Sequence, residues 1–580
     1  MTRPVLALLV LMGLPLAAAE PTFAPSPGWT MQAPAVPPPA TLNSVKPQDP
    51  AQAPEVKMAF RIAPGPCEPT WASLRQHHPT PPAWFNQAKF GVFIHWGPQA
   101  AGRSGDWYAR RLYRPGNPAY DRHLARYGHP STVGYKEVLK DWTAPQWDPA
   151  VLTQRFHDAG MRFMMVVGVH HDNFDLWDST YQPWNSVRVG PKQDMLGGWS
   201  REARKLGMRF GITFHHEYSW WWWADAYRAD RSGPKAGVPY DGHLSLADGK
   251  GTWWDGLDPR LLYNIDLGEY EKVTEIAFGK RGVFQNHHDY GVWYAERWAL
   301  RILDAIDRYD PDLIYTDGNA AEPFCGDKSG AGLRCDAARR MVAHYYNRTL
   351  ATRKQADTLA LIKFQAGNPA VGMTYETQFP RTILRDQAWI GENPVGDWYY
   401  TPDAVYDAVT LVRSLLEYAS RGGNYACAVP IDPEGGMDPA CVTMLADMGA
   451  WMRVNGDGMY GSTAWDLWGE GTVGMPNGAL GKRHITTPFT ARDLRFTVKD
   501  GALHAWLMAW PEDRTVLIRS LAEGGPTITR VDLLGHDGPL AWSWTPDGLR
   551  VTLPKDQPCR YAWGLKITTA GGLPTAVKKR

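Results

Sequence analysis

Short apolar runs alternate with helical patterns through the middle of the chain, and this alternation constrains the fold more than any other feature. Apolar runs at 90–95, 163–169, 209–215, 313–316, 359–364 and 425–429 predict strands. Helical patterns lie between them at 151–159, 198–205, 295–309, 336–350 and 402–420. Continuous apolar strands that alternate with helices are typical of a parallel sheet covered on both faces. Roughly six to eight such units predict an α/β fold, a (β/α)8 TIM-like barrel.

A doubly wound sheet is the main alternative, and it would need a glycine-rich phosphate-binding turn after the first strand. Here the first predicted strand ends in His95-Trp96-Gly97, which is not such a turn. After about residue 487, short strand patterns separated by Gly, Asp and Pro predict a small antiparallel β-sandwich. The sequence therefore divides into a barrel at 58–486 and a C-terminal sandwich at 487–580.

The N-terminus has the pattern of an export signal. A charged start at Arg3 precedes an apolar run over 5–16 and an Ala-rich end at Ala19. This pattern predicts a signal peptide at 1–19, cleavage after Ala19, and a periplasmic or secreted location, with an uncleaved anchor as the alternative. The Pro- and Ala-rich segment at 20–57 predicts a linker that does not fold by itself.

Composition excludes several classes of protein. The 61 Lys and Arg residues balance 60 Asp and Glu residues, so the chain lacks the basic excess of a nucleic-acid-binding protein. No apolar run approaches the roughly 20 residues of a membrane span. The six cysteines form no C-x-x-C pair, which argues against a zinc ribbon. Cys325 and Cys335 bracket a short loop, and either a disulfide or two thiols fits the spacing. The sequence leaves the oligomeric state open.

Polar residues follow four of the predicted strands directly. They are His95 and Trp96, then His170 and His171, then His215 and His216, and finally Asp317. Catalytic groups of a barrel lie at the C-terminal ends of its strands, so these residues predict one shared site.

The residue types favour a sugar over a metal ion. Adjacent histidines on a strand point to opposite faces, and no H-E-x-x-H motif is present, so we expect neither a metal nor a cofactor. Imidazoles can hydrogen-bond sugar hydroxyls, and the faces of Trp and Tyr stack on sugar rings. The chain has 28 Trp residues, including Trp177 and the run 220–223. A carbohydrate is therefore the expected ligand.

Two carboxylates in a sugar site indicate glycoside hydrolysis. Asp317, at the end of an apolar strand, is the predicted nucleophile. Glu376 and Glu392 compete for the role of acid/base. Glu376 is favoured because it follows a short predicted strand at 372–375, whereas Glu392 lies in a Gly-Glu-Asn-Pro segment that reads as a turn.

Several motifs, taken together and in this order, resemble the α-L-fucosidases of glycoside hydrolase family 29. The segment 84–97 resembles the family's opening signature. The segment 170–179, HHDNFDLWDS, is similar to a His-His-Asp-Gly-Phe-x-x-Trp-x-Ser motif. The segment 311–318, PDLIYTDG, is similar to the strand that carries the nucleophile. The likeness spans roughly residues 80–570, sandwich included.

This resemblance implies an exported retaining exo-α-L-fucosidase that acts on a fucosylated glycan. Asp317 would form a covalent fucosyl-enzyme, and a second carboxylate, expected to be Glu376, would serve as acid/base. The predicted substrate-binding residues are His95, Trp96, Asp106, Trp107, His170, His171, Trp177, His215 and His216. The chain has Asp106-Trp107 where the family usually has Glu-Trp, and Tyr375-Glu376-Thr377 where one branch has Glu-Arg-Gly. Another α-L-glycoside, such as an α-L-galactoside, and a non-catalytic fucose-binding protein are the alternatives.

Overall fold

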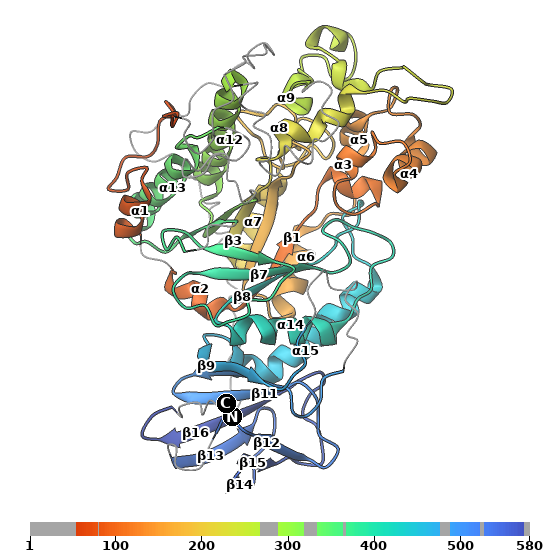
Figure 1. The fold of residues 1–580 in the computed structure, drawn as a ribbon. Helices are drawn as coiled ribbons and strands as arrows, with labels where there is room; N and C mark the ends of the chain where they lie inside the picture. Colours follow the sequence, from red (N-terminus) through yellow and green to blue (C-terminus); the bar gives the residue numbers. More distant parts are fainter. Residues whose placement is uncertain are drawn as a thin grey trace, which may run out of the picture.

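The computed structural model describes residues 54–78, 81–266, 288–317, 333–363, 367–475, 488–521 and 527–573. The predicted signal peptide at 1–19, most of the linker at 20–57, and Cys325 lie outside these residues. Val56, at the end of the predicted linker, already forms a β-bridge with Cys335. The ribbon has a barrel-like upper part and an all-β lower part (Figure 1).

The upper part is built on an eight-stranded sheet in which every strand pairing is parallel, as predicted. Its order is β5-β4-β3-β2-β1-β8-β7-β6. The strands are β1 (Phe90–Ile94), β2 (Phe163–Val169), β3 (Arg209–Phe214), β4 (Leu313–Thr316), β5 (Leu359–Ile362), β6 (Met373–Glu376), β7 (Trp389–Pro394) and β8 (Asn424–Ala428). Phe93, Met165, Leu361 and Ile390 belong to one buried apolar cluster contributed by different strands of this sheet.

The two ends of this sheet, β5 and β6, nearly meet. In the part of the chain that the structure describes, one bridge joins them, between Leu361 and Gly372. Ile362 donates to the Gly372 carbonyl at 3.0 Å, and Gly372 donates to the Ala360 carbonyl at 2.8 Å. Beyond this bridge, toward the C-terminal ends of the strands, no further ladder of described residues closes the barrel. We call this junction the seam.

Helices pack around the sheet, and several begin at an aspartate that caps their first turn. They include α6 (Pro149–Asp158), α7 (Met195–Lys205), α12 (His288–Tyr309), α13 (Ala337–Arg353), α14 (Ala408–Ser420) and α15 (Pro439–Met459). Asp148, Asp194 and Asp407 accept backbone N–H groups at the starts of α6, α7 and α14. Asp407 therefore ends the loop that the sequence pattern had assigned to a helix from residue 402. Among the described residues, no helix has the length and apolar character needed to cross a bilayer.

The segment around Glu392 differs from the sequence prediction. It is the strand β7, fully buried from Trp389 to Pro394, and not a turn. Gly391 belongs in this strand because the ring of Tyr418 on α14 would lie 2.1 Å from any Cβ at that position. Pro394 is tolerated because it is the last residue of the strand. The Gly and Pro here serve packing and strand termination, which their turn-like spacing in the sequence does not reveal.

The lower part is an antiparallel sandwich, as predicted. One sheet has the order β13-β16-β11-β10-β9 and the other β12-β15-β14. The strands are β9 (Thr463–Glu470), β10 (Leu494–Lys499), β11 (Ala502–Leu507), β12 (Thr515–Ile518), β13 (Thr527–Leu533), β14 (Trp542–Thr545), β15 (Gly548–Thr552) and β16 (Trp563–Ala570). Since β9 pairs with β10, the sandwich begins before the predicted boundary at 487.

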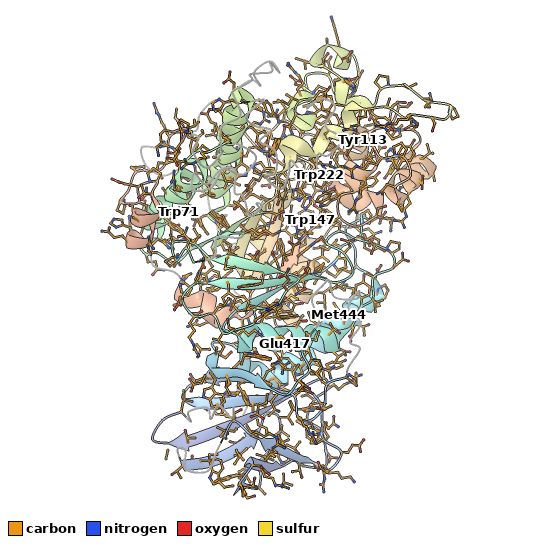
Figure 2. All side chains as sticks on the ribbon, viewed as in Figure 1. Trp71, Tyr113, Trp147, Trp222, Glu417 and Met444 are labelled. Carbon is orange, nitrogen blue, oxygen red and sulfur yellow. The ribbon has the colours of Figure 1, made fainter. Side chains whose placement is uncertain are left out.

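A buried ion-pair network joins the two parts. Glu417 on α14, labelled above the sandwich in Figure 2, accepts from Arg495 on β10 at 2.5 Å. Arg421, one helical turn later, donates to the other carboxylate oxygen of Glu417. Glu417 is 1% exposed and Arg495 is fully buried. These ion pairs therefore satisfy buried charges at an interface that water does not reach.

Candidate functional site

Four histidines meet at the C-terminal ends of β1, β2 and β3. The ring centroids of His95, His170 and His215 lie 4.8–5.7 Å from one another. His171 lies beside them, its ring 4.2 Å from that of His170. Because β2 ends at Val169, His170 and His171 are in a turn, and the strand alternation that would separate them does not apply. The structure thus brings together the strand-end histidines of three neighbouring strands.

Asp317 follows β4 and faces two of these imidazoles. Its Oδ2 is 3.2 Å from His215 Nδ1 and 3.5 Å from His171 Nε2. His171 donates Nδ1–H to the His215 carbonyl at 2.6 Å, so its Nε2 carries the lone pair of the neutral ring. His215 Nε2 is 3.0 Å from the Thr213 hydroxyl, which leaves its Nδ1–H for Asp317. These bonds fix which ring nitrogen can donate and which can accept.

Lys363, the residue after β5, contacts both predicted catalytic carboxylates. Its Nζ is 2.6 Å from Asp317 Oδ1 and 2.8 Å from Glu376 Oε2. Both oxygens contact the same nitrogen, so the distance between the two oxygens cannot exceed the sum of these two distances. That limit falls within the carboxyl separation of about 5–5.5 Å typical of retaining glycosidases. Sequence reasoning missed Lys363 because the predicted strand at 359–364 contains it, whereas β5 ends at Ile362.

Glu392 joins this group of side chains through the hydroxyl of Tyr315. The Tyr315 hydroxyl is 3.3 Å from Glu392 Oε1 and 3.4 Å from Asp317 Oδ1. The side chain of Glu376 is 34% exposed, whereas Glu392 as a residue is 1% exposed. Of the two candidates for acid/base, Glu376 is therefore the one that solvent and a leaving group can reach.

Burial and charge give these groups very different acidities. Burial would raise the pKa of Asp317, but the Lys363 cation and His215 outweigh it and hold that pKa well below its usual range. Burial would lower the pKa of Lys363, and the surrounding anions raise it well above its usual range instead. Burial raises the pKa of Glu392 to about 8. Asp317 is thus ionised and Glu392 protonated near neutral pH.

The histidine cluster is uncharged near neutral pH. Burial, together with neighbouring imidazoles, lowers the pKa of His95 and His170 well below the usual value. Burial lowers the pKa of His171 to about 3, and it lowers the pKa of His215 as well. Neutral imidazoles offer one donor and one acceptor each, which suits hydroxyl groups better than a charged ligand.

Asp106 and Trp107 extend the site from the loop after β1. Asp106 Oδ1 is 3.7 Å from His170 Nε2. Gln99 Nε2 donates to the other ring nitrogen of His170 at 2.7 Å, so Nε2 carries the hydrogen that points toward Asp106. Trp107 lies edge-on to His171, with ring centroids 6.2 Å apart.

Further aromatic rings surround the histidines, and sequence reasoning did not assign most of them. Trp222, labelled in Figure 2, ends α8 (Ser219–Trp222). Its ring centroid lies 4.6 Å from that of His171 and 4.6 Å from that of Trp107. The ring centroid of Tyr218 lies 4.9 Å from that of His171, and the ring centroid of Trp398 lies 4.6 Å from that of His95. Tyr399 lies 5.0 Å from His170. The run of Trp residues was expected to wall the approach, but Trp222 is fully buried and packs behind the histidines.

Three predicted substrate-binding residues lie in the core instead. Trp96 is 1% exposed, donates to the Asp432 carbonyl at 2.8 Å and packs on Trp142. Trp177 is fully buried and donates to Asp304 at 3.0 Å. His216 is 3.2 Å from the Trp298 carbonyl, on the side of β3 that faces α12. Trp96 and His216 each follow a histidine that enters the site, and they point the other way.

The histidine cluster fits a metal ion poorly. One ligand atom from each of His95, His170 and His215, and from each of His171, His215 and Asp317, lies within 4.8 Å of the others. Such spacing alone would permit a transition metal. However, His215 is common to both sets, and its two nitrogens already face Thr213 and Asp317. The Lys363 cation on Asp317 would also repel a second cation.

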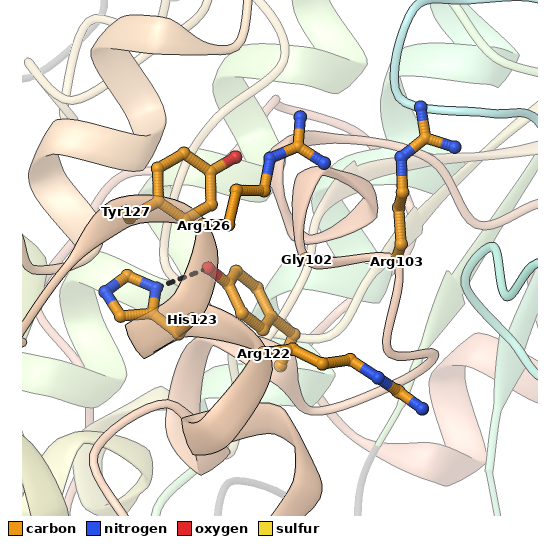
Figure 3. Close-up of a pocket in the computed structure, with 7 residues that line it drawn as sticks. Gly102, Arg103, Arg122, His123, Arg126 and Tyr127 are labelled. Carbon is orange, nitrogen blue, oxygen red and sulfur yellow. Dashed lines mark hydrogen bonds between the residues drawn. The ribbon is translucent and has the colours of Figure 1, made fainter.

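A separate basic cavity lies behind the loop that carries Asp106. Its volume is about 200 Å³, and it is lined by Gly102, Arg103, Tyr108, Arg122, His123, Arg126 and Tyr127 (Figure 3). Tyr108 is hydrogen-bonded to His123 Nδ1 at 2.6 Å. None of the predicted site residues lines this cavity, so it is distinct from the histidine cluster.

Comparisons with known proteins agree on one family. The family model "Alpha-L-fucosidase" matches residues 56–457, and "Alpha-L-fucosidase C-terminal domain" matches residues 487–568. Tissue alpha-L-fucosidase of Rattus norvegicus is 25% identical over 524 residues, covering 87% of this chain and 94% of its own. Plasma alpha-L-fucosidase of Homo sapiens is 23% identical over 526 residues, covering 86% and 92%.

Solved structures share the fold. The Thermotoga maritima alpha-fucosidase in complex with fucose superposes with a TM-score of 0.61 at 22% identity, covering 86% of this chain and all of its own. Alpha-L-fucosidase isoenzyme 1 from Paenibacillus thiaminolyticus gives a TM-score of 0.55 at 17% identity, with 86% and 99% coverage. At these identities the likeness supports the barrel-and-sandwich architecture and nothing finer.

Proposed function

Because the chain belongs to the alpha-L-fucosidase family of glycoside hydrolases, we propose that it is a retaining exo-α-L-fucosidase that releases terminal fucose from glycans. Asp317 is the nucleophile and Glu376 the acid/base. The observation that carries this proposal is the contact of both carboxylates with Lys363 Nζ. It keeps them near enough for a covalent intermediate and too close to leave room for a water between them.

The reaction proceeds in two steps at the anomeric carbon. Asp317 attacks that carbon while Glu376 gives its proton to the departing glycosidic oxygen, and a fucosyl ester forms. Glu376 then takes a proton from water, which attacks the ester and frees Asp317. The low pKa of Asp317 supports the first step, because the attacking carboxylate must be ionised.

The histidines orient the sugar. His171 Nε2 carries a lone pair and accepts a hydrogen bond from a fucose hydroxyl. His170 Nε2–H donates to another hydroxyl, with Asp106 beside it. Trp107, half-buried and backed by Trp222, offers an apolar face that suits the C–H groups and the methyl of fucose.

Removing the nucleophile tests the assignment. Asp317→Ala should lose at least ~10³-fold of kcat on an aryl α-L-fucoside, and added azide should restore turnover with a β-fucosyl azide as product. Glu376→Ala should slow hydrolysis of poor leaving groups far more than of dinitrophenyl fucoside, whose departure needs no proton. Glu392→Gln is the matched control and should leave this leaving-group dependence unchanged. Full activity of Asp317→Ala would reject the mechanism.

The sugar itself needs a separate comparison. A panel of aryl α-L-fucosides, α-L-galactosides and other α-L-glycosides should show the highest kcat/KM for the fucoside. A preference for the galactoside would move the proposal to a related sugar on the same fold. Fucose binding by calorimetry, without hydrolysis of any fucoside, would instead identify a binding protein.

We also propose that the protein is exported and matures at Glu20. The charged, apolar and Ala-rich parts of 1–19 support this. N-terminal sequencing of protein expressed from the full chain should begin at Glu20 in the exported fraction, and deletion of 2–19 should abolish export. An intact N-terminus on the exported protein would indicate an anchor instead.

A further inference from the structure

Lys363 holds a position that the mechanism above leaves without a role. We propose that Lys363 is a positioning residue whose ammonium group accompanies the single negative charge of the site as that charge passes from Asp317 to Glu376. The inference rests on the proposed function, because it needs Asp317 as nucleophile and Glu376 as acid/base. It adds a role for this chain's own residue at the end of β5.

The geometry places one cation between two carboxyl groups. Lys363 Nζ contacts Asp317 Oδ1 at 2.6 Å and Glu376 Oε2 at 2.8 Å. The side chain of Lys363 is 9% exposed and that of Asp317 is 7% exposed, so water screens their attraction weakly. A buried ammonium is costly unless it is paired, which makes a constant partner important at every stage of the reaction.

The charges balance at both stages. The proposed first step needs Asp317 ionised and Glu376 protonated, so at that stage Asp317 is the anionic partner of Lys363. After the first step Asp317 is a neutral ester, and Glu376 has passed its proton to the leaving oxygen and become a carboxylate. Lys363 again has one anionic partner, and it has moved no proton itself. The same cation thus favours ionised Asp317 before attack and ionised Glu376 when water must be activated.

The seam gives Lys363 a second task. Lys363 follows β5, Glu376 ends β6, and the bridge between Leu361 and Gly372 is the one described link between these strands. Four registered pairs join β4 to β5, whereas among the described residues no backbone hydrogen bond joins the C-terminal end of β6 to β5. The contact from Lys363 to Glu376 spans this gap. It therefore sets the separation of the two carboxylates across the seam.

Other titratable groups face Lys363 from each neighbouring element. Tyr315 on β4, Glu392 on β7 and Asp317 contribute negative or polar partners that raise its pKa. His95, His170, His171 and His215 follow β1 to β3, and each feels its positive charge. Tyr218 follows β3 and also senses Lys363. These imidazoles are neutral near pH 7, so Asp317 and Glu376, which contact Lys363 directly, are the groups that a substitution of Lys363 affects most.

The pH dependence of Lys363→Met separates this role from simple packing. Without the cation, Asp317 and Glu376 each lose a partner that stabilises the carboxylate form. Asp317 must be ionised and Glu376 protonated, so both limbs of the kcat/KM profile should move to higher pH by about one unit. At the parent's optimum, kcat should fall roughly tenfold or more. Lys363→Arg should restore part of both effects.

Two controls keep the outcomes distinct. Lys136→Met removes another buried lysine, which pairs with Glu137 and Asp241. This substitution should not move either limb of the pH profile. Azide rescue of Asp317→Ala tests the nucleophile independently. If azide rescues Asp317→Ala but Lys363→Met keeps both limbs in place, with or without a lower rate, the charge role of Lys363 is wrong and the proposed function stands. If Asp317→Ala keeps full activity, the proposed function fails and the role of Lys363 fails with it.

Discussion

His170 and His171 are neighbours in sequence, yet they serve different sides of the site. His170 faces Asp106 and is held by Gln99, while His171 faces Asp317 and is held by the His215 carbonyl. Each ring has one nitrogen fixed by the protein, and the other faces a carboxylate. At this scale backbone and amide groups impose the tautomers that decide which nitrogen can donate and which can accept.

The rule that catalytic groups follow the strands of a barrel predicted part of the site but not all of it. His95, His170, His215 and Asp317 each follow an apolar run, and the barrel rule brings them together. Lys363 obeys the same rule, but a lone lysine after a strand is common on protein surfaces and carries no chemical signature. Trp398 and Trp222 come from loops, whose path over the barrel mouth the sequence pattern does not encode.

Glu392 links stability to pH at a single residue. Burial raises its pKa from an ordinary 4.5 to about 8. Between these values the folded chain keeps a proton that the unfolded chain has released, so this group's contribution to the free energy of unfolding falls as pH rises. Glu392→Gln, which is neutral at all pH values, removes that loss. The melting temperature of Glu392→Gln minus that of the parent, measured by calorimetry, should therefore be larger at pH 8 than at pH 5.

The matched control for this measurement is Glu434→Gln. Glu434 pairs with Arg103 at the surface and is buried far less than Glu392. Its effect on the melting temperature should be small and should not grow between pH 5 and pH 8. Equal behaviour of the two variants would mean that Glu392 is ionised in the folded chain at neutral pH.

At the scale of elements, strand positions were easier to predict than the element that carries Glu392. Seven of the eight barrel strands coincide with apolar or short strand patterns in the sequence. The missing one, β7, contains Gly391, Asn393 and Pro394, residues that usually mark turns. Its strand conformation depends on Tyr418 from α14, a contact between residues far apart in sequence. Local propensity has no access to such a contact.

The ion pair between α14 and β10 should contribute strongly to stability. Glu417→Ala leaves Arg495 and Arg421 buried without their carboxylate, and we expect a loss of about 3–5 kcal/mol in the free energy of unfolding. The two arginines lower the pKa of Glu417, so the stabilisation is present at neutral pH and is lost as acid protonates the carboxylate. Denaturant unfolding at pH 7 measures the effect. A loss below ~1 kcal/mol, as expected of a surface pair, would contradict it.

At the scale of the whole molecule, the sandwich has a buried cluster of its own, but one core also extends across its junction with the barrel. Trp506, Met508 and Ala562 of the sandwich belong to the same buried cluster as the helices of the barrel. Trp451 on α15 donates to the Ala562 carbonyl at 2.8 Å. The sequence pattern separated the two parts at residue 487, but β9, which lies before that boundary, pairs with β10, which lies after it. The division into domains is therefore less complete than the change of pattern indicates.

This shared core predicts cooperative unfolding. The described parts should melt in one calorimetric transition, with equal calorimetric and van't Hoff enthalpies. Glu417→Ala should lower the temperature of the whole transition rather than split it. Two resolved transitions in the parent protein would show that the sandwich unfolds by itself.

The seam between β5 and β6 has a consequence for how proteins of this shape diversify. Elsewhere in the barrel, main-chain ladders set the distance between neighbouring strand ends, and substituting a side chain leaves that distance alone. At the seam, the side chain of Lys363 spans the gap by contacting both Asp317 and Glu376. A single codon change at position 363 can thus alter the spacing of these two carboxylates while the main-chain ladders of the sheet stay the same.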